Sequence, residues 1–335
     1  MRLIVIIAIV FIFSASAPVF ADQSLFYKEL NLIAGYSDRK EWVGKSQDLM
    51  NSAGFEYYRK FSNDYGDFLT ADLQLRLAYD SSEAWEDAWG LGIHNAWLQY
   101  KLSPVHKIKF GHFDPAFGLE QVLDTHSTLL QTLVPKNIGF KKDWGVALEG
   151  ALPDFDYSAA LQLGSGMSIY RKDGSFLATS RIGTPAGRNL QGGLSLMYGK
   201  VLGIMGMSTF PRGELLSDKA ILKKRVGLDG QYLFGPYLFK AEVAFGKDED
   251  KDVLGYLYEI DYTLPKLQNC ELQLQFQSWL HDLDRKGTDD STVTVGAAYK
   301  LNSQVMLRLA FAHDFNLMES REDELFLVQF YFYGR

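Results

Sequence analysis

The chain has 335 residues, a formal net charge of −7 and one cysteine, Cys270. The acidic balance argues against nucleic acid as a partner, and a single thiol excludes an intramolecular disulfide framework. Aromatic residues make up 14% of the chain at a mean hydropathy of −0.11, values that fit a membrane β-barrel or a periplasmic all-β enzyme.

The N-terminus has the features of an export signal. Arg2 supplies a positive charge, an apolar stretch runs from Leu3 to Phe13, and Ala21 ends a segment with the small residues that signal peptidase reads. The apolar stretch is shorter than the roughly 20 residues that span a bilayer, which argues against an uncleaved anchor. We therefore predict a signal peptide over residues 1–21 and one β-barrel domain over residues 22–335.

After the signal, the chain alternates apolar and polar residues with a period of two. In Phe68 to Tyr79, Leu73 and Leu75 lie on one face, whereas Asp72 and Arg76 lie on the other. Because charged side chains do not face lipid, the polar face must meet water. The pattern predicts an all-β fold, a transmembrane antiparallel up-and-down β-barrel.

The same alternation recurs along the whole chain. Since bacterial single-chain barrels have even strand numbers, we expect about 16 strands, with about 18 as the alternative. The predicted segments are Tyr27–Tyr36, Ala53–Phe61, Phe68–Tyr79, Gly90–Leu102, Val105–Phe113, Lys141–Leu152, Phe155–Gly164, Phe176–Gly183, Asn189–Gly199, Val201–Phe210, Lys219–Phe234, Pro236–Gly246, Val253–Leu264, Cys270–Leu280, Thr292–Leu301, Gln304–Phe315 and Glu324–Tyr333.

Short and long connections alternate between these segments. Short periplasmic turns and longer external loops are typical of outer-membrane barrels, so the sequence predicts a Gram-negative outer-membrane location. The predicted short turns are Ser103-Pro104, Pro153-Asp154, Gly199-Lys200, Gly235-Pro236 and Asn302-Ser303. The predicted longer loops are Asp80–Trp89, Lys247–Asp252, His281–Ser291 and Asn316–Asp323.

One connection, between the predicted strands ending at Phe113 and starting at Lys141, is much longer than the others. A loop of this size inside a compact fold is usually functional. Apolar side chains recur in it at near-helical spacing: Leu119, Val122, Leu123, Leu129, Leu130 and Leu133. We expect this loop, after the fifth strand, to fold inward and narrow a pore. Packing outside the barrel or at a subunit interface is the alternative.

The start of this loop is similar to a known family. Residues 107–120 resemble the strand and loop of the phosphate-selective porin family (porin O/P), whose members carry a G-Q-F-x-x-P-F-G-L-E segment, and residues 143–150 resemble its next strand. Ala116 is an extra residue within the match. The matching residues are Gly111, Phe113, Pro115, Phe117, Gly118, Leu119 and Glu120. The resemblance implies a trimeric sixteen-stranded channel with a constriction loop, lined by arginine and lysine where phosphate is the solute.

Alternation and the loop together supply candidate pore-lining or constriction residues. They are Arg76, Lys101, Lys107, Lys109, Asp114, Glu120, Glu149, Arg225, Lys240 and Arg308. Predicted lumen-facing cations and anions nearly balance, and rings of a single charge are what impose ion selectivity. A strong phosphate site is therefore not indicated, although Lys107 and Lys109 are the best local candidates for contact with an anion.

Catalytic and metal-binding patterns are absent from the sequence. The six histidines show no zinc-ligand spacing, and Ser165 and His313 supply nucleophile and base in separate strands. We expect no enzyme activity, metal or cofactor, and passive diffusion of small hydrophilic solutes or ions, including anions such as phosphate, through a porin-like channel. A barrel that serves as a scaffold or sheath for a partner protein is the alternative, and an outer-membrane hydrolase is a further, weaker one.

Overall fold

The computed structural model describes residues 23–38, 42–46, 49–79, 89–123, 128–202, 209, 219–285, 287, 289–315 and 324–335. The predicted signal peptide, the predicted loop Asn316–Asp323 and residues 80–88 of the predicted loop Asp80–Trp89 lie outside these residues. In the described part of the chain, no helix is long and apolar enough to cross a membrane.

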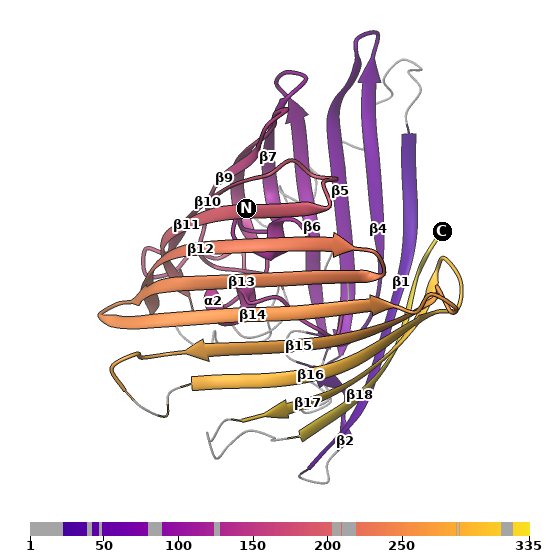
Figure 1. Ribbon diagram of the computed structural model, residues 1–335. Coiled ribbons are helices and arrows are strands. Elements are labelled where there is room, and N and C mark those ends of the chain that lie inside the picture. The colour runs from indigo at the N-terminus through magenta and orange to yellow at the C-terminus, as the bar shows by residue number, and fades with distance from the viewer. Residues whose placement is uncertain are drawn as a thin grey trace.

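The described chain folds into a closed antiparallel β-barrel (Figure 1). Its sheet has eighteen strands, two of which are only two residues long, so sixteen full strands form the wall. The full strands are β1 (Gln23–Ser37), β4 (Leu49–Asn63), β5 (Gly66–Tyr79), β6 (Trp89–Lys101), β7 (His106–Phe113), β8 (Asp143–Ala151), β9 (Asp156–Gln162), β10 (Phe176–Gly183), β11 (Leu190–Leu202), β12 (Ala220–Phe234), β13 (Tyr237–Asp248), β14 (Lys251–Thr263), β15 (Cys270–Leu280), β16 (Asp289–Lys300), β17 (Val305–Asp314) and β18 (Glu324–Gly334). The short elements are β2 (Trp42–Val43), β3 (Lys45–Ser46), the 3-10 turn η1 (Leu119–Gln121) and α2 (Val134–Asn137).

Pairing between the first and last full strands closes the barrel. The register of β1 on β18 runs from Lys28 opposite Gly334 to Ser37 opposite Leu325, and β1 pairs with β4 along its other edge. Closure removes free sheet edges and satisfies the backbone hydrogen bonds that lipid cannot. The predicted barrel of about sixteen strands is confirmed.

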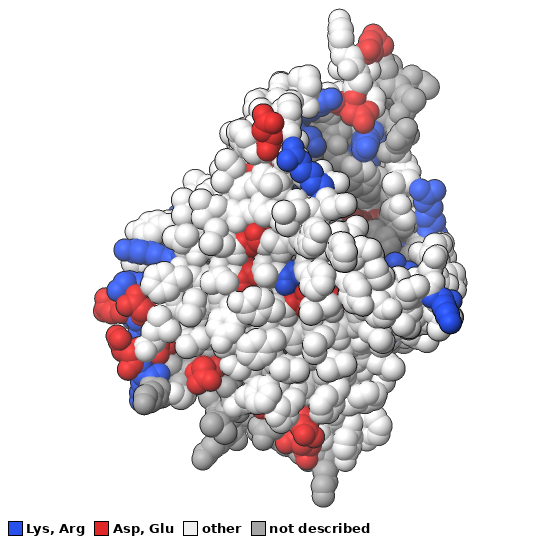
Figure 2. Space-filling view, viewed as in Figure 1, with Lys and Arg blue, Asp and Glu red and all other residues white. Residues whose placement is uncertain are grey.

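Alternation separates an apolar outer face from a polar inner face. On β5, Leu77 points outward and is 47% exposed, whereas its neighbour Arg76 points inward and is 4% exposed. The outer surface over β12 to β16 is largely uncharged, and charged side chains gather at the strand ends and around a hollow at the upper right of the view (Figure 2). A wall of this kind presents apolar side chains to lipid and polar side chains to the interior.

Two of the predicted boundaries are wrong. Gly199 and Lys200 do not form a turn, because β11 continues through them to Leu202, opposite Leu222 to Ala220 on β12. A Cβ on Gly199 would lie 2.5 Å from the carbonyl oxygen of Phe176, so this glycine permits close strand packing rather than a turn. The predicted strand Val201–Phe210 is therefore not separate: its first two residues end β11, and beyond them only Thr209 is described.

The polar segment Lys247–Asp252, predicted as a longer loop, is the tip of a tight hairpin. The register of β13 on β14 continues to Asp248 opposite Lys251, so only Glu249 and Asp250 connect the two strands. Glu249 has a positive φ of 54°, as tight hairpin connections often require. Charged residues at a barrel rim are solvated whether they lie in a strand or a loop, which is why polarity alone did not distinguish the two.

Candidate functional site

The loop between β7 and β8, residues 114–142, is here called the inner loop, and its described residues, 114–123 and 128–142, lie inside the barrel. Its backbone or side chains contact β10, β11, β12, β13 and β15, and its apolar residues pack against β1, β17 and β18. In Figure 1, α2 lies behind β13 and β14, within the ring of strands. The predicted inward fold of the loop after the fifth full strand is confirmed, and the alternative of packing outside the barrel is wrong for the described part of the loop.

Side chains on three wall strands hold the first part of the inner loop by its backbone. Each contact has a wall oxygen accepting a hydrogen bond from a backbone N–H, and none of the N–H groups has a partner in regular secondary structure. The pairs are Ala116 to Oγ1 of Thr179, Gly118 to Oγ of Ser195 and Leu119 to Oε2 of Glu242, each at 3.0 Å. These contacts satisfy buried donors that would otherwise be costly.

Gly118 is required by this geometry. Its φ is +62°, and a Cβ at this position would lie 2.2 Å from Oε1 of Glu242. The neighbouring Phe117 is fully buried, in one cluster with Leu177, Met197 and Trp279 of the wall. The matching residues of the P-A-F-G-L segment are therefore explained by how the loop docks on the wall, independently of any solute.

The leucines of the inner loop anchor its second part. Leu129 and Leu130 pack with Ile33, Ala310 and Leu327 on one side of the barrel. Farther along, Leu133, Val134 and Ile138 join the cluster of Phe117, Val201 and Trp279 on the other side. The near-helical spacing thus reflects apolar contacts on two sides, since only η1 and α2 of the described inner loop are helical.

Polar contacts fix α2 and its surroundings. Arg225 donates from Nε to Oδ1 of Asn137 at 2.9 Å and pairs with Asp248 at 2.5 Å. Lys223 donates to the carbonyl oxygen of Ile138 at 2.9 Å, where the end of α2 leaves carbonyl groups without helical partners. Arg225 therefore lies inside the barrel, as predicted, and supports the inner loop.

At the other end of the inner loop, predicted residues form ion pairs with its second arm. Asp114 pairs with Lys142 at 2.7 Å, and Glu120 lies 3.8 Å from Lys141. Glu120 also accepts a hydrogen bond from the Thr132 hydroxyl. These contacts join the two arms of the inner loop, so that it crosses the barrel as one connected layer.

Three other predicted cations lie on the inner wall in ion pairs or hydrogen bonds. Arg76 on β5 makes a bidentate pair with Glu29 on β1, at 2.7 and 2.8 Å, across β4. Lys109 pairs with Glu149 at 2.6 Å. Arg308 donates to Oε1 of Gln329 at 2.8 Å.

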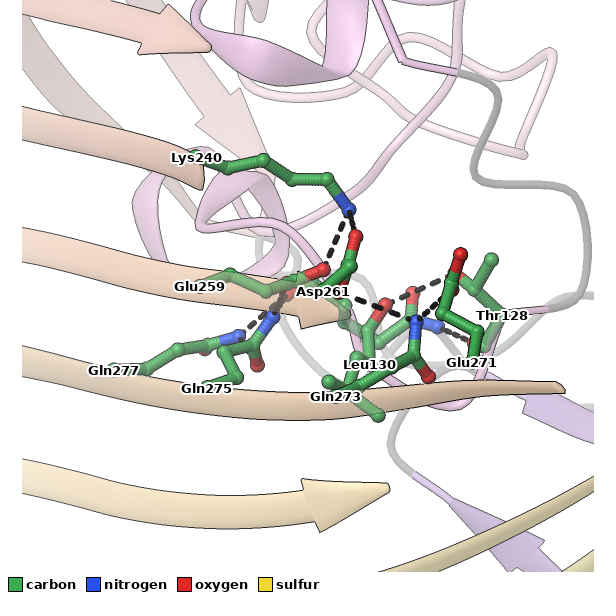
Figure 3. A network of polar contacts seen from close by, with 10 residues as sticks. Thr128, Leu130, Lys240, Glu259, Asp261, Glu271, Gln273, Gln275 and Gln277 are labelled. Atoms are coloured by element: carbon green, nitrogen blue, oxygen red, sulfur yellow. Dashed lines mark hydrogen bonds and ion pairs between the residues drawn. The ribbon is translucent and has the colours of Figure 1, made fainter. Parts of the chain in front are cut away.

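Lys240 belongs to the polar network shown in Figure 3. Its ammonium lies 2.6 Å from Glu259 and 2.7 Å from Asp261 on the neighbouring β14. The network continues along β15 through Glu271, Gln273, Gln275 and Gln277 and reaches the inner loop at the carbonyl oxygen of Gln131. Among the residues drawn, Lys240 is the one cation, and the carboxylates are those of Glu259, Asp261 and Glu271 (Figure 3).

Lys101 and Lys107 differ from the other predicted cations. Both are exposed, and no carboxylate of the described residues lies within ion-pair distance of either. They lie opposite each other on β6 and β7, at the end of the barrel where the short turns lie. The ten predicted residues therefore do not form one cluster but line the inner wall and the inner loop from end to end.

Several contact residues were not among the predicted site residues: Glu29, Lys142, Thr179, Ser195 and Glu242. Alternation alone places the strand residues on the inner face, so that signal was present in the sequence. Which inner residue meets the inner loop depends on the path of the loop. In the described residues, no group of three or more His, Cys, Asp or Glu side chains is arranged to hold a metal.

No protein-family model and no curated protein sequence matches the chain. Similar solved structures include OmpT, an outer-membrane protein of Vibrio cholerae in a trimer form, with a TM-score of 0.66, 14% identity, and coverage of 94% of this chain and 100% of that one. An anion-selective porin from Comamonas acidovorans has a TM-score of 0.63, 12% identity, and coverage of 93% and 99%. The outer-membrane channel DcaP of Acinetobacter baumannii has a TM-score of 0.59, 12% identity, and coverage of 93% and 97%. At these identities the likeness concerns the fold, which is that of Gram-negative outer-membrane barrels.

Proposed function

We propose that the chain is a porin-like channel of the Gram-negative outer membrane, exported by a cleaved signal peptide, through which small hydrophilic solutes or ions diffuse passively. The observation that carries the proposal is the inner loop, anchored to wall side chains across a barrel with a polar inner face. A layer fixed at so many points narrows the lumen to a defined size. The porin and channel folds with which the barrel shares its architecture support the same reading.

Charge balance supports weak ion selectivity in preference to a dedicated phosphate site. Arg225, Lys109 and Lys240 each lie in an ion pair, which lowers their influence on a passing ion. Any preference for anions such as phosphate would then rest on Lys101 and Lys107, which have no acidic partner among the described residues.

We also propose that the chain forms a homotrimer and has no enzyme activity. The trimer form of the Vibrio cholerae protein supports the first point through a shared fold. The absence of enzyme activity is supported by the positions of Ser165 and His313. The hydroxyl of Ser165 donates a hydrogen bond to the carbonyl oxygen of Ser168, while His313 lies at the end of β17, 3.8 Å from Glu324. The residue types for hydrolysis are not brought together in these contacts.

Planar-bilayer recording of the full mature chain tests the channel. We expect stepwise conductance, and in a KCl gradient the double variant Lys101→Glu and Lys107→Glu should move the reversal potential towards that of K⁺. The matched control is Lys247→Glu with Lys266→Glu, which makes the same change of charge at two exposed positions outside the lumen. A chain that inserts without conducting and co-purifies with a second protein would instead be a scaffold, and the channel proposal would be wrong.

A further inference from the structure

A cavity of 310 Å³ lies between η1 of the inner loop and the wall strands β7 to β11. The argument uses six of its lining residues: Lys107, Gln121, Glu149, Asp156, Arg181 and Gln191. They lie at the end of the barrel where the short turns lie, on the inner face. The volume is at the lower end of the range for small-molecule sites, so the cavity fits a small and polar ligand.

Two of the four charged groups in this cavity are neutralised by neighbours. Glu149 pairs with Lys109 at 2.6 Å and also accepts a hydrogen bond from Gln99 at 2.7 Å. Arg181 makes a bidentate pair with Asp229 on β12, at 2.5 and 2.9 Å. Neither charge can interact with a ligand unless a close ion pair is first broken.

The other two charged groups, Lys107 and Asp156, have no partner of opposite charge among the described residues. Lys107 is exposed to the cavity and makes no ion pair. Asp156 accepts a hydrogen bond only from the backbone N–H of Ala186, at 2.9 Å to Oδ2. The cavity therefore presents one free cation and one free anion.

The sheet register fixes where these two groups lie. Lys107 is opposite Glu149 on β8, Glu149 is opposite Ser158 on β9, and Asp156 is two residues from Ser158 on the same face. Lys107 and Asp156 are thus two strands apart and offset by two residues along the strand, which places their Cα atoms roughly 12 Å from each other. The long lysine side chain can shorten that span to the length of one small ligand.

We infer that this cavity binds a small zwitterion, such as a free amino acid or a dipeptide, with its carboxylate at Lys107 and its ammonium group at Asp156. The side-chain amide of Gln121, whose Oε1 has no hydrogen-bond partner among the described residues, adds an acceptor for the ammonium or peptide N–H group. Gln191 is already bonded to Arg188 and Gln231. An inorganic anion is a poorer match, because the free carboxylate of Asp156 shares the cavity with Lys107. The inference rests on the proposed channel function and names a solute class for it.

Glycylglycine is a suitable probe, and its binding to the purified full chain in detergent is measured by isothermal titration calorimetry at neutral pH. Lys107→Gln and Asp156→Asn each remove one charge at nearly constant size. We expect each variant to weaken glycylglycine binding about tenfold or more. Lys266→Gln and Asp154→Asn, which remove the same charges at exposed turn positions outside the cavity, should leave binding unchanged.

Inorganic phosphate is titrated in parallel. No glycylglycine binding, or binding that Asp156→Asn leaves intact, overturns the inference, and tighter binding of phosphate would assign the cavity to an anion. Conductance of the same preparation is recorded separately. A conducting chain that does not bind the dipeptide refutes this inference alone, whereas a non-conducting chain that binds it through both residues refutes only the proposed channel.

Discussion

Glu242 on β13 accepts a hydrogen bond at 3.0 Å from the backbone N–H of Leu119, a residue 123 positions earlier in the chain. The carboxylate is fully buried, and its other oxygen, Oε1, has no hydrogen-bond partner among the described residues. One wall side chain thus holds the inner loop at the point where the loop enters the lumen. This contact makes the position of the loop testable by substitution.

Removing the Glu242 carboxylate should release the start of the inner loop. We expect Glu242→Ala to weaken docking by about 1–3 kcal/mol, because the Leu119 N–H loses its buried acceptor. Larger and noisier single-channel conductance would follow. Glu242→Gln keeps an oxygen acceptor and is the control; equal behaviour of the two variants would show that this contact does not position the loop.

Gly118→Ala tests the close approach of the loop to the wall. A methyl group there would lie 2.2 Å from Oε1 of Glu242, so the carboxylate must move and lose its contact with Leu119. The control is Gly174→Ala, at a φ of +67° with no atom within 4 Å of the added Cβ. Gly118→Ala also strains the backbone, because φ +62° with ψ −154° is a conformation that essentially only glycine adopts. Gly174→Ala shares the positive φ but not the clash.

We expect both glycine variants to fold, as judged by heat-modifiable migration on gels. Only Gly118→Ala should alter conductance, since only its methyl group displaces a loop contact. If Gly174→Ala changed conductance to the same extent, backbone strain rather than loop position would be responsible.

Arg76 and Glu29 test how the interior stabilises the wall. Both side chains are almost fully buried, at 5% and 1% exposure, and the pair joins β5 to β1 across β4. Arg76→Ala leaves a buried carboxylate without its main partner and should cost about 3 kcal/mol or more. Urea unfolding in lipid vesicles, followed by tryptophan fluorescence, measures the loss.

The control for Arg76 is Lys200→Ala. Lys200 pairs with Asp173 at 3.3 Å, but both side chains are about 40% exposed, and exposed pairs contribute at most about 1 kcal/mol. Comparable losses in the two variants would contradict the idea that burial gives the Arg76 pair its importance.

Lys240 is the one cation of the network in Figure 3. Lys240→Gln removes the ammonium that lies within 2.7 Å of Glu259 and Asp261, so that their negative charge is no longer offset. We expect the reversal potential in a KCl gradient to shift towards K⁺. Lys266→Gln removes an exposed charge in a turn and should give no shift; a shift of the same size there would point to net charge, not to the lumen.

The wall could be predicted from the sequence because the alternation within each strand shows which of its side chains face lipid and which face the interior. Asp72 and Arg76 on one face of β5 and Leu73 and Leu75 on the other suffice to place that strand. The errors arose where local composition is ambiguous: Gly199 suggested a turn but serves close strand packing, and Lys247–Asp252 suggested a loop but forms a hairpin tip.

The candidate site could be predicted only in part. Alternation correctly placed residues such as Arg225 and Lys240 inside the barrel, but it could not say that Arg225 holds Asn137 or that Lys240 joins Glu259. Those partners depend on where the inner loop runs and on cross-strand register. Neither is set by residues close together in the sequence.

The anchors of the inner loop come from strands that are made after it. Glu242 and Gln277 lie 123 and 146 positions beyond their loop partners. Until β13 and β15 are in place, the N–H of Leu119 and the carbonyl oxygen of Gln131 lack these wall partners and are left to water. The lumen of an unfinished barrel would therefore be wider and filled with water. It would reach its final width only late in assembly, when the inner loop docks on these strands.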